Sequence, residues 1–580
     1  MNGRQPRNGY PAWIRQPWFW LGLGLLAVYL RGLFLDLMDV DATQYASIAM
    51  EMLQNGHWLE VQHRYADYLD KPPLLFWASA ASFAAFGLHN WAYKLPSFLG
   101  ALAGIYAVYR FSRLFYTKET ALHAAAILAS CAGVLLLCND VRTDTLLMGM
   151  TACAVWQLAE WLRTVRPGGD VAGAEPRRGA HLFFSALFIG LAMLAKGPIG
   201  LVAPGFAVAT HLLMRREWKR LFDWRWLLTL PVLGLLLLPM CWGLYQQFDL
   251  HPEKAVNGRT GVSGLYFFFW EQSFGRITGE NAWRNDTSPF YFFHVYLWAF
   301  LPWPLLLAGA LASRLRRVLL QRFHLPAGDE AYSLGAFLLT FAALSMSKYK
   351  LPHYIFITLP WAAVLTARWL GPATSPGGRL RWLWGMQYFA LFALAVLGCA
   401  LLVFVFPTRN PVLWGVPVAL FAAVAVQAVR RPFPARAGLL VQRSALTFLG
   451  VAFILNFHFY PQLLPYQSTT AVPRYARQHG IPLDKLAFYN RHGHALDFYS
   501  GRILPEMRSP DQVRQRAQAS GPFWLYTNAE GRARLDSAGL QYVQTAAFPH
   551  FQVALLKPAF LNPTTRARTL KPVYLLEIRK

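Results

Sequence analysis

The sequence is poor in charged residues. Only 14% of its 580 residues are Asp, Glu, Lys or Arg, whereas 55% are hydrophobic and 15% are aromatic. A soluble domain usually carries nearer a quarter of charged residues. Apolar runs of about 20 residues, long enough to cross roughly 30 Å of hydrocarbon, recur along most of the chain. The composition therefore excludes an ordinary soluble protein and predicts a polytopic α-helical membrane protein.

Cysteine is scarce as well. The five cysteines all fall inside apolar runs, at Cys131, Cys138, Cys153, Cys241 and Cys399. There they are expected to be small buried side chains, so the sequence suggests neither a disulfide framework nor a zinc site. The first apolar run, Trp18 to Leu35, lacks a small-residue cleavage pattern after it. We therefore expect a signal anchor instead of a cleaved signal peptide.

The formal net charge of +26 invites a nucleic-acid interpretation. Its distribution argues against nucleic acid, because basic residues alternate in density from loop to loop, as membrane topology requires. With the N-terminus in the cytoplasm, the predicted cytoplasmic segments carry more Lys and Arg than the external loops. We therefore expect membrane lipids, and no nucleic acid, around this protein.

Hydropathy predicts about 13 transmembrane helices. They lie near residues 17–37, 95–115, 120–138, 145–162, 180–196, 198–214, 226–247, 290–312, 331–347, 354–370, 382–406, 413–429 and 440–460. The run 72–87 is short and begins with two prolines, so we interpret it as a helix lying along the interface. This choice keeps the positive residues inside and places the C-terminus outside.

The amino-acid pattern changes after residue 460, where long apolar runs give way to shorter segments. Short β-rich runs such as "PFWLYTN" and "PVYLLEI" alternate there with polar helical patterns. We expect residues 1–461 to form the transmembrane domain, with external juxtamembrane helices near 39–90 and 248–289. Residues 462–580 are then expected to form a small external α/β domain.

Charged residues gather where external segments meet the spans. They occur in "MDVDATQYA" after the first span and in "NDVRTD", "AKGPIG" and "SKYKLPHY" further along. Charges at membrane depth are costly and usually functional, although residues at helix ends are also often just solvated or snorkelling. Taken together, the carboxylates and cations indicate a site at the outer membrane surface for a charged headgroup.

The stretch from Asp41 to Leu53 predicts a one-sided helix lying in the interface, because apolar residues recur at helical spacing. Asp39 or Asp41 would lie at its N-terminus, where a carboxylate often serves as a cap, and this alternative stays open for either residue. A carboxylate fixed there would also make a general base. Phosphate is best held by Lys and Arg, and the candidates are Lys71, Arg142, Lys196 and Arg276.

Eight stretches, in this order and spacing, resemble bacterial GT-C glycosyltransferases of the protein-O-mannosyltransferase superfamily, especially the lipid A 4-amino-4-deoxy-L-arabinose transferases. They are "DATQYA" (41–46), "DKPPLL" (70–75), "KLPSFLGAL" (94–102), "VRTDTLLM" (141–148), "LAKGPIG" (194–200), "FFWEQSFGRITGE" (268–280), "LPWPLLL" (301–307) and "SKYKLPHYI" (347–355). The resemblance implies an inverting transferase in the bacterial inner membrane. Its site would face the periplasm, and its donor would be a sugar on undecaprenyl phosphate.

The resemblance also implies roles for individual residues. Asp41 matches the family's catalytic aspartate, and Asp144 matches a residue of the same cavity. Lys71 and Arg276 match the residues that hold the carrier phosphate, and Arg142 is a further candidate for that role. We expect the pocket to include Tyr45, Tyr68, Asp70, Lys196, Lys350 and Tyr354.

Two departures from the family pattern concern carboxylates. Ala42 stands where relatives carry Glu, and Asp70 stands where they carry Glu before Lys-Pro-Pro. In aminoarabinose transferases the second glutamate can take part in a metal site, which makes Asp70 and His251 candidate ligands. We expect that no cofactor is required, with a divalent metal left open. The expected acceptor is a lipid or glycan such as lipid A, and the expected state is a monomer.

Three other functions are alternatives. Transfer of a mannose-like sugar to a protein or glycan is the first alternative. A transporter or flippase is disfavoured, because no inverted repeat is evident and the polar residues gather at one face instead of the midplane. A receptor would use the external domain, where "YNRHGHALDFY" carries His492, His494 and Asp497. That spacing is not diagnostic of a metal site, and we interpret the segment as a surface loop.

Overall fold

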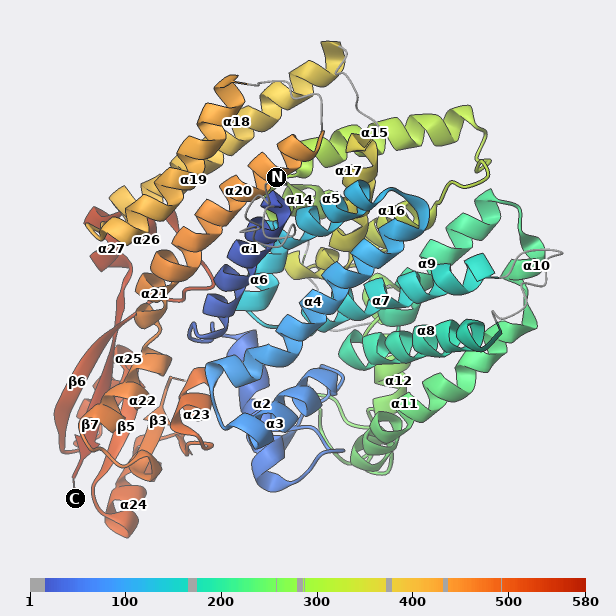
Figure 1. The fold of residues 1–580 in the computed structure, drawn as a ribbon. Helices are drawn as coiled ribbons and strands as arrows, with labels where there is room; N and C mark the ends of the chain where they lie inside the picture. The colour runs from blue at the N-terminus through green and yellow to red at the C-terminus, as the bar shows by residue number, and fades with distance from the viewer. Residues whose placement is uncertain are drawn as a thin grey trace, which may run out of the picture.

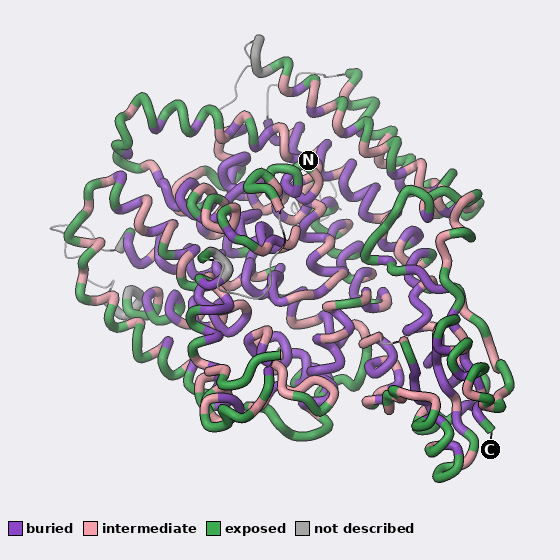
Figure 2. The backbone as a smooth tube through the Cα atoms, turned by 180° about the vertical axis from the view of Figure 1, so that it is seen from behind, coloured by how far each residue is buried: buried purple, intermediate pink, exposed green. Residues whose placement is uncertain are grey.

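The computed structural model describes residues 16–164, 175–256, 258–278, 285, 287–371, 378–430, 437–491 and 493–579. A large helical bundle lies beside a sheet formed by the C-terminal part of the chain (Figure 1). Buried segments fill the middle of the bundle and the sheet, while exposed segments follow the periphery (Figure 2).

The helices of the bundle follow one another with short links. The first half comprises α1 Pro17–Leu33, α2 Asp41–Asn55, α3 Leu74–Phe86, α4 Asn90–Phe115, α5 Lys118–Ala129, α6 Ala132–Asn139, α7 Thr143–Thr164, α8 Glu175–Lys196 and α9 Ile199–Met214. The second half comprises α10 Trp218–Leu221, α11 Thr229–Leu244, α12 Gly264–Tyr266, α13 Gly275–Thr278, α14 Tyr291–Ala299, α15 Pro304–Leu320, α16 Tyr332–Met346, α17 Leu359–Leu370, α18 Gly378–Ala400, α19 Pro411–Arg430, α20 Ala437–Ile454 and α21 Tyr460–Leu463.

Five helical segments of the described chain are long and apolar enough to cross a membrane, and α5 with α6, bent by 52°, would make a sixth. Some other expected spans are shorter apolar helices, such as α9 and α16, or are interrupted, as 290–312 is between α14 and α15. The helices α4 and α7 are long, with 26 and 22 residues, but are not among the five apolar segments. Helix α3 has 13 residues and is only about 20 Å long. That length is too short to cross the hydrocarbon. The chain is therefore a polytopic helical membrane protein, and the number of 13 spans stays a prediction.

Helices α4 and α7 touch through glycines. A β-carbon on Gly149 would lie 2.1 Å from the carbonyl oxygen of Gly100, and one on Gly104 would lie 3.0 Å from the Cα of Gly149. Small residues let membrane helices approach backbone to backbone, where dispersion and not the hydrophobic effect drives association. This contact fixes the N-terminal half of α7, where Asp144 lies, against α4.

The C-terminal part contains a five-stranded sheet with the strand order β4-β3-β5-β7-β6. β3 pairs in parallel with β4 and β5, while β7 pairs antiparallel with β5 and β6. Apolar side chains cover both faces of the sheet. The elements are α22 Ser468–Gln478, β3 Leu486–Tyr489, α23 His494–Ser500, β4 Glu506–Met507, α24 Pro510–Ser520, β5 Phe523–Asn528, α25 Ala529–Ser537, β6 Tyr542–His550, α26 Pro558–Leu561, α27 Pro563–Thr569 and β7 Lys571–Ile578.

Helix α2 is enclosed by protein, which corrects the expectation of a one-sided helix in the interface. Ten of its 15 residues are buried, because α3 and α23 both pack against it. Ser47 donates to the backbone oxygen of His494 at 2.9 Å, and buried Glu51 accepts the backbone N–H groups of Arg64 and Tyr65 at 2.7 Å each. Packing by the C-terminal domain therefore replaces the membrane surface.

The interpretation of "YNRHGHALDFY" as a surface loop is wrong for its second half. Asp497 is fully buried in α23, where it accepts a hydrogen bond from Arg64 of the link between α2 and α3. His494 lies 3.1 Å from His63 of the same link, and His492 lies outside the described residues. These contacts bind the sheet domain to the helical bundle.

His550 gives this domain a pH dependence. Arg491 donates to its Nε2, so Nδ1 of the neutral ring donates to Ser468, 2.8 Å away. Burial, assisted by Arg491 and Lys571, lowers the pKa of His550 to about 4. Because this folded-state pKa lies below the unfolded value near 6.5, stability is complete above pH 6.5 and falls as the pH drops toward 4. The loss is at most ~3 kcal/mol.

We predict that His550→Gln flattens this dependence, since Gln keeps a neutral acceptor for Arg491. The measurement is backbone hydrogen exchange of β5 and β7 in the full chain between pH 7 and pH 4, corrected for intrinsic rates. His479→Gln, which changes the exposed histidine that directly follows α22, is the matched control. If His550→Gln keeps the same pH dependence of hydrogen exchange as the parent protein, His550 is not the group responsible.

Candidate functional site

A guanidinium shared by two carboxylates forms the centre of the candidate site. Arg142, in the link between α6 and α7, donates through Nη1 to Asp41 Oδ2 and through Nε and Nη2 to Asp140 Oδ2 at 3.1 and 2.9 Å. Burial opposes the charge of Arg142, but Asp140 and Asp41 outweigh it and raise its pKa above the ordinary value. A permanent cation therefore holds Asp41, which is still 32% exposed.

A second ion pair lies beside the first. Asp144, buried in the first turn of α7, accepts a hydrogen bond from Lys196 at the end of α8. The Lys196 ammonium also lies 3.8 Å from the ring centroid of Tyr354, a cation–π contact. His353 links the pairs, since Nδ1 lies 3.4 Å from Arg142 Nη1 and Nε2 lies 3.7 Å from Asp144 Oδ2. The two pairs thus form one charged cluster.

The structure separates the two aspartates that precede and open α2. Helix α2 has no side-chain cap, so neither residue has the capping role that the sequence left open. Asp39 accepts hydrogen bonds from Thr43 and Thr469, each at 2.6 Å. Asp41 instead faces Arg142. Asp39 therefore fastens the C-terminal domain to α2, and Asp41 is the one directed into the charged cluster.

Two tyrosines expected in the pocket lie around Phe76. The ring centroids of Tyr45 and Tyr68 are 5.7 and 6.0 Å from that of Phe76, in edge-to-face contacts. Burial raises the pKa of both phenols well above the ordinary value. Both hydroxyls are therefore neutral near pH 7 and can donate or accept a hydrogen bond.

A cavity of about 180 Å³ opens beside the second ion pair. Lys71, Lys196 and Tyr354 line it, together with Gln272 and a majority of apolar side chains. The Gln272 amide donates to the backbone oxygen of Asp70, which fixes the segment that carries Lys71. Two ammonium groups beside an apolar wall suit a ligand that has both a phosphate and a hydrocarbon chain.

Several residues predicted for the pocket do not line this cavity. Tyr68 and Asp70 line a narrow neighbouring cavity that also includes Lys71, and Tyr45 packs against Phe76. Lys350 is directed elsewhere, because its ammonium donates to the backbone oxygen of Thr287 at 3.0 Å and borders a separate polar cavity of about 640 Å³. Arg276 belongs to the short helix α13, but its side chain lies outside the described residues. Its predicted role in phosphate binding therefore stays a prediction.

The proposed metal ligands do not form a cluster. His251 is exposed and its Nδ1 lies 2.9 Å from Glu253, while Asp70 lines a narrow cavity next to Lys71. Throughout the described residues, no group of three or more His, Cys, Asp or Glu side chains could hold a metal ion. The pair Asp70 and His251 does not fit a metal site by itself.

The sequence placed Asp140 and His353 among the charged external positions but assigned neither of them a role in the site. Asp140 shares Arg142 with Asp41, and His353 connects Arg142 to Asp144. Both residues lie in the quoted motifs "NDVRTD" and "SKYKLPHY". The signal was therefore present, but only the folded chain shows that the two motifs meet.

The fold defines the class as a polytopic membrane protein that is similar in structure to ArnT. The crystal structure of ArnT from Cupriavidus metallidurans bound to undecaprenyl phosphate matches with a TM-score of 0.69 and 19% identity, covering 98% of both chains. The apo structure of the same protein matches with a TM-score of 0.66 and 19% identity, covering 96% of this chain and 98% of that chain.

The sequence comparisons point to the same relatives. The family described as dolichyl-phosphate-mannose-protein mannosyltransferase matches residues 70–242. The undecaprenyl phosphate-alpha-4-amino-4-deoxy-L-arabinose arabinosyl transferase 2 of Sodalis glossinidius is 29% identical over 62% of this chain and 60% of its own length. The transferase of the same name from Pseudomonas aeruginosa strain UCBPP-PA14 is 28% identical over 71% of this chain and 69% of its own length. The chain thus spans about 60% of the first of these relatives, and the resemblance to this group is confirmed.

The contacts of Asp39 give a prediction about the domain junction. Asp39→Ala removes the acceptor of two hydrogen bonds, so we expect the attachment of the C-terminal domain to weaken by about 1–3 kcal/mol. Backbone amides of residues 468–471 should exchange hydrogen faster, by hydrogen-exchange mass spectrometry. Asp41→Asn, two positions away, should leave this exchange unchanged. Equal exchange rates in the two variants would contradict the conclusion that Asp39, and not Asp41, holds the C-terminal domain.

Proposed function

We propose that the protein is an inverting glycosyltransferase that moves a sugar from an undecaprenyl-phosphate-linked donor to a periplasm-facing acceptor. The specific proposal is the transfer of 4-amino-4-deoxy-L-arabinose or a related sugar to lipid A. The observation that carries it is Asp41, fixed by Arg142 next to a cavity with Lys71 and Lys196. The names of the relatives and the ligand of the matching crystal structure support the choice of donor and acceptor.

The topology belongs to the proposal. Residues 1–461 are taken as the transmembrane domain with 13 spans, and residues 462–580 as a periplasmic α/β domain. The excess of Lys and Arg in the predicted cytoplasmic segments supports this orientation. The contact between α23 of the sheet domain and α2, which carries Asp41, supports placing the domain and the site on the same side of the membrane.

The donor is proposed to place its phosphate at Lys71 and Lys196, with its prenyl chain along the apolar wall of the cavity. Arg276 is assigned to the same phosphate from the resemblance. During transfer, the bond between the anomeric carbon and the phosphate oxygen breaks, and the electron pair stays on the phosphate. The ammonium groups stabilise this developing charge, which is the electrostatic part of catalysis.

The acceptor oxygen is proposed to approach the anomeric carbon from the opposite face, beside Asp41. Arg142 divides its donors between Asp41 and Asp140, so we assign it to positioning Asp41 and not to the donor phosphate. Asp41 then either takes the proton of an acceptor hydroxyl or orients an acceptor phosphate, which needs no deprotonation. Tyr45 and Tyr68 supply neutral hydrogen-bonding groups nearby.

A second candidate is transfer of a mannose-like sugar to a protein or glycan. The description of the matching family, which names a mannose donor and a protein acceptor, favours this alternative for residues 70–242. The same cluster would perform either reaction, because both reactions need the Asp41 carboxylate, the cations and the leaving phosphate. The donor sugar and the acceptor are what separate the two proposals.

We predict that Asp41→Asn lowers the rate of sugar transfer by about 100-fold or more, because it removes the group that acts on the acceptor. The assay uses purified protein, undecaprenyl-phosphate-linked aminoarabinose and lipid A, and mass spectrometry of the product. Asp36→Asn is the matched control, since Asp36 pairs with Arg474 at the domain junction. Substantial transfer by Asp41→Asn would show that Asp41 is not the group that acts on the acceptor. Unmodified lipid A with the parent protein would favour the mannose-like alternative.

A further inference from the structure

A second charged cluster, formed by Arg314, Asp329, Glu330 and Arg368, lies at the opposite ends of the helices that form the candidate site. Asp144 opens α7, whereas Leu162 and Arg163 at the other end of α7 line a different cavity. The 26 residues of α4 would span about 39 Å, from Asn90 beside α2 to Phe115 at this second cluster. The two clusters are thus separated by about the thickness of a membrane.

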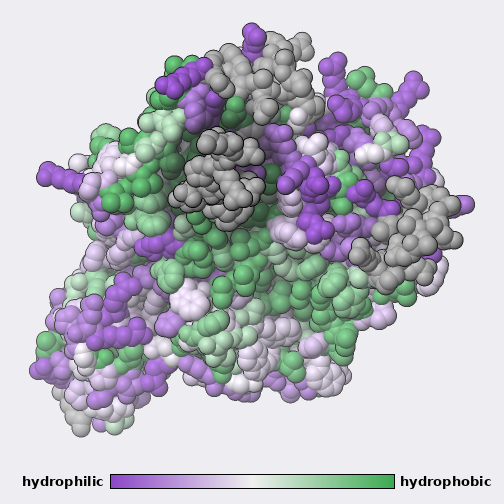
Figure 3. All heavy atoms as spheres, in the orientation of Figure 1, coloured by the Kyte–Doolittle hydropathy of each residue, from purple (hydrophilic) through white to green (hydrophobic). Residues whose placement is uncertain are grey.

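The hydrophilic surfaces also lie at the two ends of the molecule, with a hydrophobic surface between them. Hydrophilic atoms cover the sheet domain at lower left and the region around the end of α15 at upper right, and hydrophobic atoms form much of the surface between them (Figure 3). With the sheet domain in the periplasm, as proposed above, the second cluster lies at the cytoplasmic surface.

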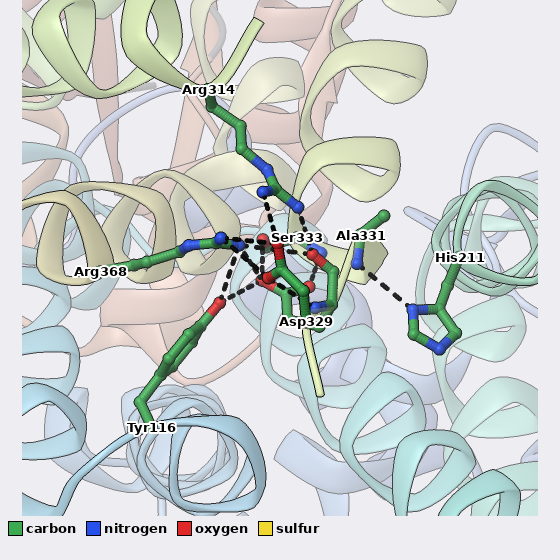
Figure 4. Close-up of polar contacts among 8 residues, drawn as sticks. Tyr116, His211, Arg314, Asp329, Ala331, Ser333 and Arg368 are labelled. Carbon is green, nitrogen blue, oxygen red and sulfur yellow. Dashed lines mark hydrogen bonds and ion pairs between the residues drawn. The ribbon is translucent and has the colours of Figure 1, made fainter. Parts of the chain in front are cut away.

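Two arginines of the second cluster converge on one acidic turn (Figure 4). Arg314 of α15 donates to Asp329 at 2.9 Å and to the backbone oxygen of Glu330 at 2.6 Å. Arg368 of α17 donates to Asp329 at 2.9 Å. Tyr116 donates to Glu330 Oε1 at 2.6 Å. The turn before α16 is thereby locked between α15, α17 and the end of α4.

A cavity of about 640 Å³ lies against this network. It is lined by the three arginines Arg314, Arg317 and Arg368, by the hydroxyls of Thr117, Thr120 and Ser313, and by Phe115, Leu365 and Trp369. The proposed donor and acceptor do not use it, because it lies at the far end of the bundle. Its lining combines cations and hydroxyl groups with an aromatic and aliphatic wall.

The charges of the lining are not balanced. Asp329 and Glu330, which pair with Arg314 and Arg368 from outside the lining, supply two negative charges against the three arginines, and this leaves one positive charge in excess. Arg317 is exposed and makes no ion pair with any residue that the structure describes. The Nε of Arg314, a side chain that is only 5% exposed, is buried and makes no hydrogen bond within the described part of the chain. An unmatched cation and a buried unsatisfied donor in one cavity indicate an anionic ligand.

The surroundings favour a lipid as the source of that anion. Leu315 and Leu319 of α15, 39% and 62% exposed, lie one turn apart beside the arginines, and Leu320 is 73% exposed. We propose that the cavity binds the phosphate of an anionic phospholipid of the cytoplasmic leaflet, with Arg317 as the exposed contact and Arg314 behind it. Basic pockets between membrane helices on that side are known to take phospholipid headgroups. Inorganic phosphate has the same charge chemistry but would leave the apolar wall unused.

The test measures lipid retention by the purified full chain with native mass spectrometry. Phosphatidylglycerol should be retained in preference to phosphatidylcholine. Arg317→Gln should weaken phosphatidylglycerol binding about tenfold, as expected for the loss of one charge-assisted contact. Arg316→Gln is the matched control, because Arg316 is the exposed neighbour on α15 that does not line the cavity. Equal retention in the two variants overturns the proposal.

Two further arms keep the result interpretable. Ser313→Trp should fill the cavity without a change of charge and should also reduce retention, while equal melting temperatures of all variants show that they fold. In the second arm, inorganic phosphate replaces the lipid. If phosphate stabilises the parent but not Arg317→Gln, and phosphatidylglycerol has no advantage over phosphatidylcholine, the cavity binds free phosphate and the lipid proposal is wrong. Neither arm depends on glycosyl transfer, so this proposal and the proposed function can fail separately.

Discussion

The sharing of Arg142 between Asp41 and Asp140 is the interaction on which the site depends. It joins the start of α2 to the link between α6 and α7, which lie about 100 residues apart in the sequence, and His353 extends the connection to the segment before α17. Partly exposed ion pairs contribute little stability by themselves. Here the pair is better understood as fixing geometry, because a planar guanidinium holds two carboxylates in a defined relative position.

The sequence predicted the residues of this cluster better than their contacts. Asp41, Asp144, Arg142, Lys71 and Lys196 were named from polar positions at span ends and from motif resemblance, and the structure brings them to one end of the bundle. Lys350 was named for the same reasons but is directed toward Thr287. A helix-end position says on which side of the membrane a residue lies. It does not say toward which neighbour the side chain turns, because that depends on loops distant in the sequence.

The environment of α2 shows a second limit of sequence reasoning. Its apolar spacing predicted one buried face, and a membrane surface was the simplest cover. The polar side of α2 is instead covered by α23, with Ser47 and Glu51 satisfied by the backbone and Asp497 paired with Arg64. Periodicity cannot distinguish a polar face that meets water from one that meets hydrogen-bond partners of another domain. The sheet domain therefore becomes part of the framework that holds Asp41.

The two ends of the bundle also differ in charge balance, and this difference bears on how each would accept a phosphate. At the candidate site, Arg142, Lys196 and Lys71 meet four carboxylates, Asp41, Asp70, Asp140 and Asp144, so these charges sum to minus one. A donor phosphate would have to compete with Asp144 for Lys196, unless a further cation such as Arg276 joined it. At the opposite cavity the arginines already exceed the carboxylates. The first arrangement suits a phosphate that must leave after each transfer, whereas the second suits one that stays bound.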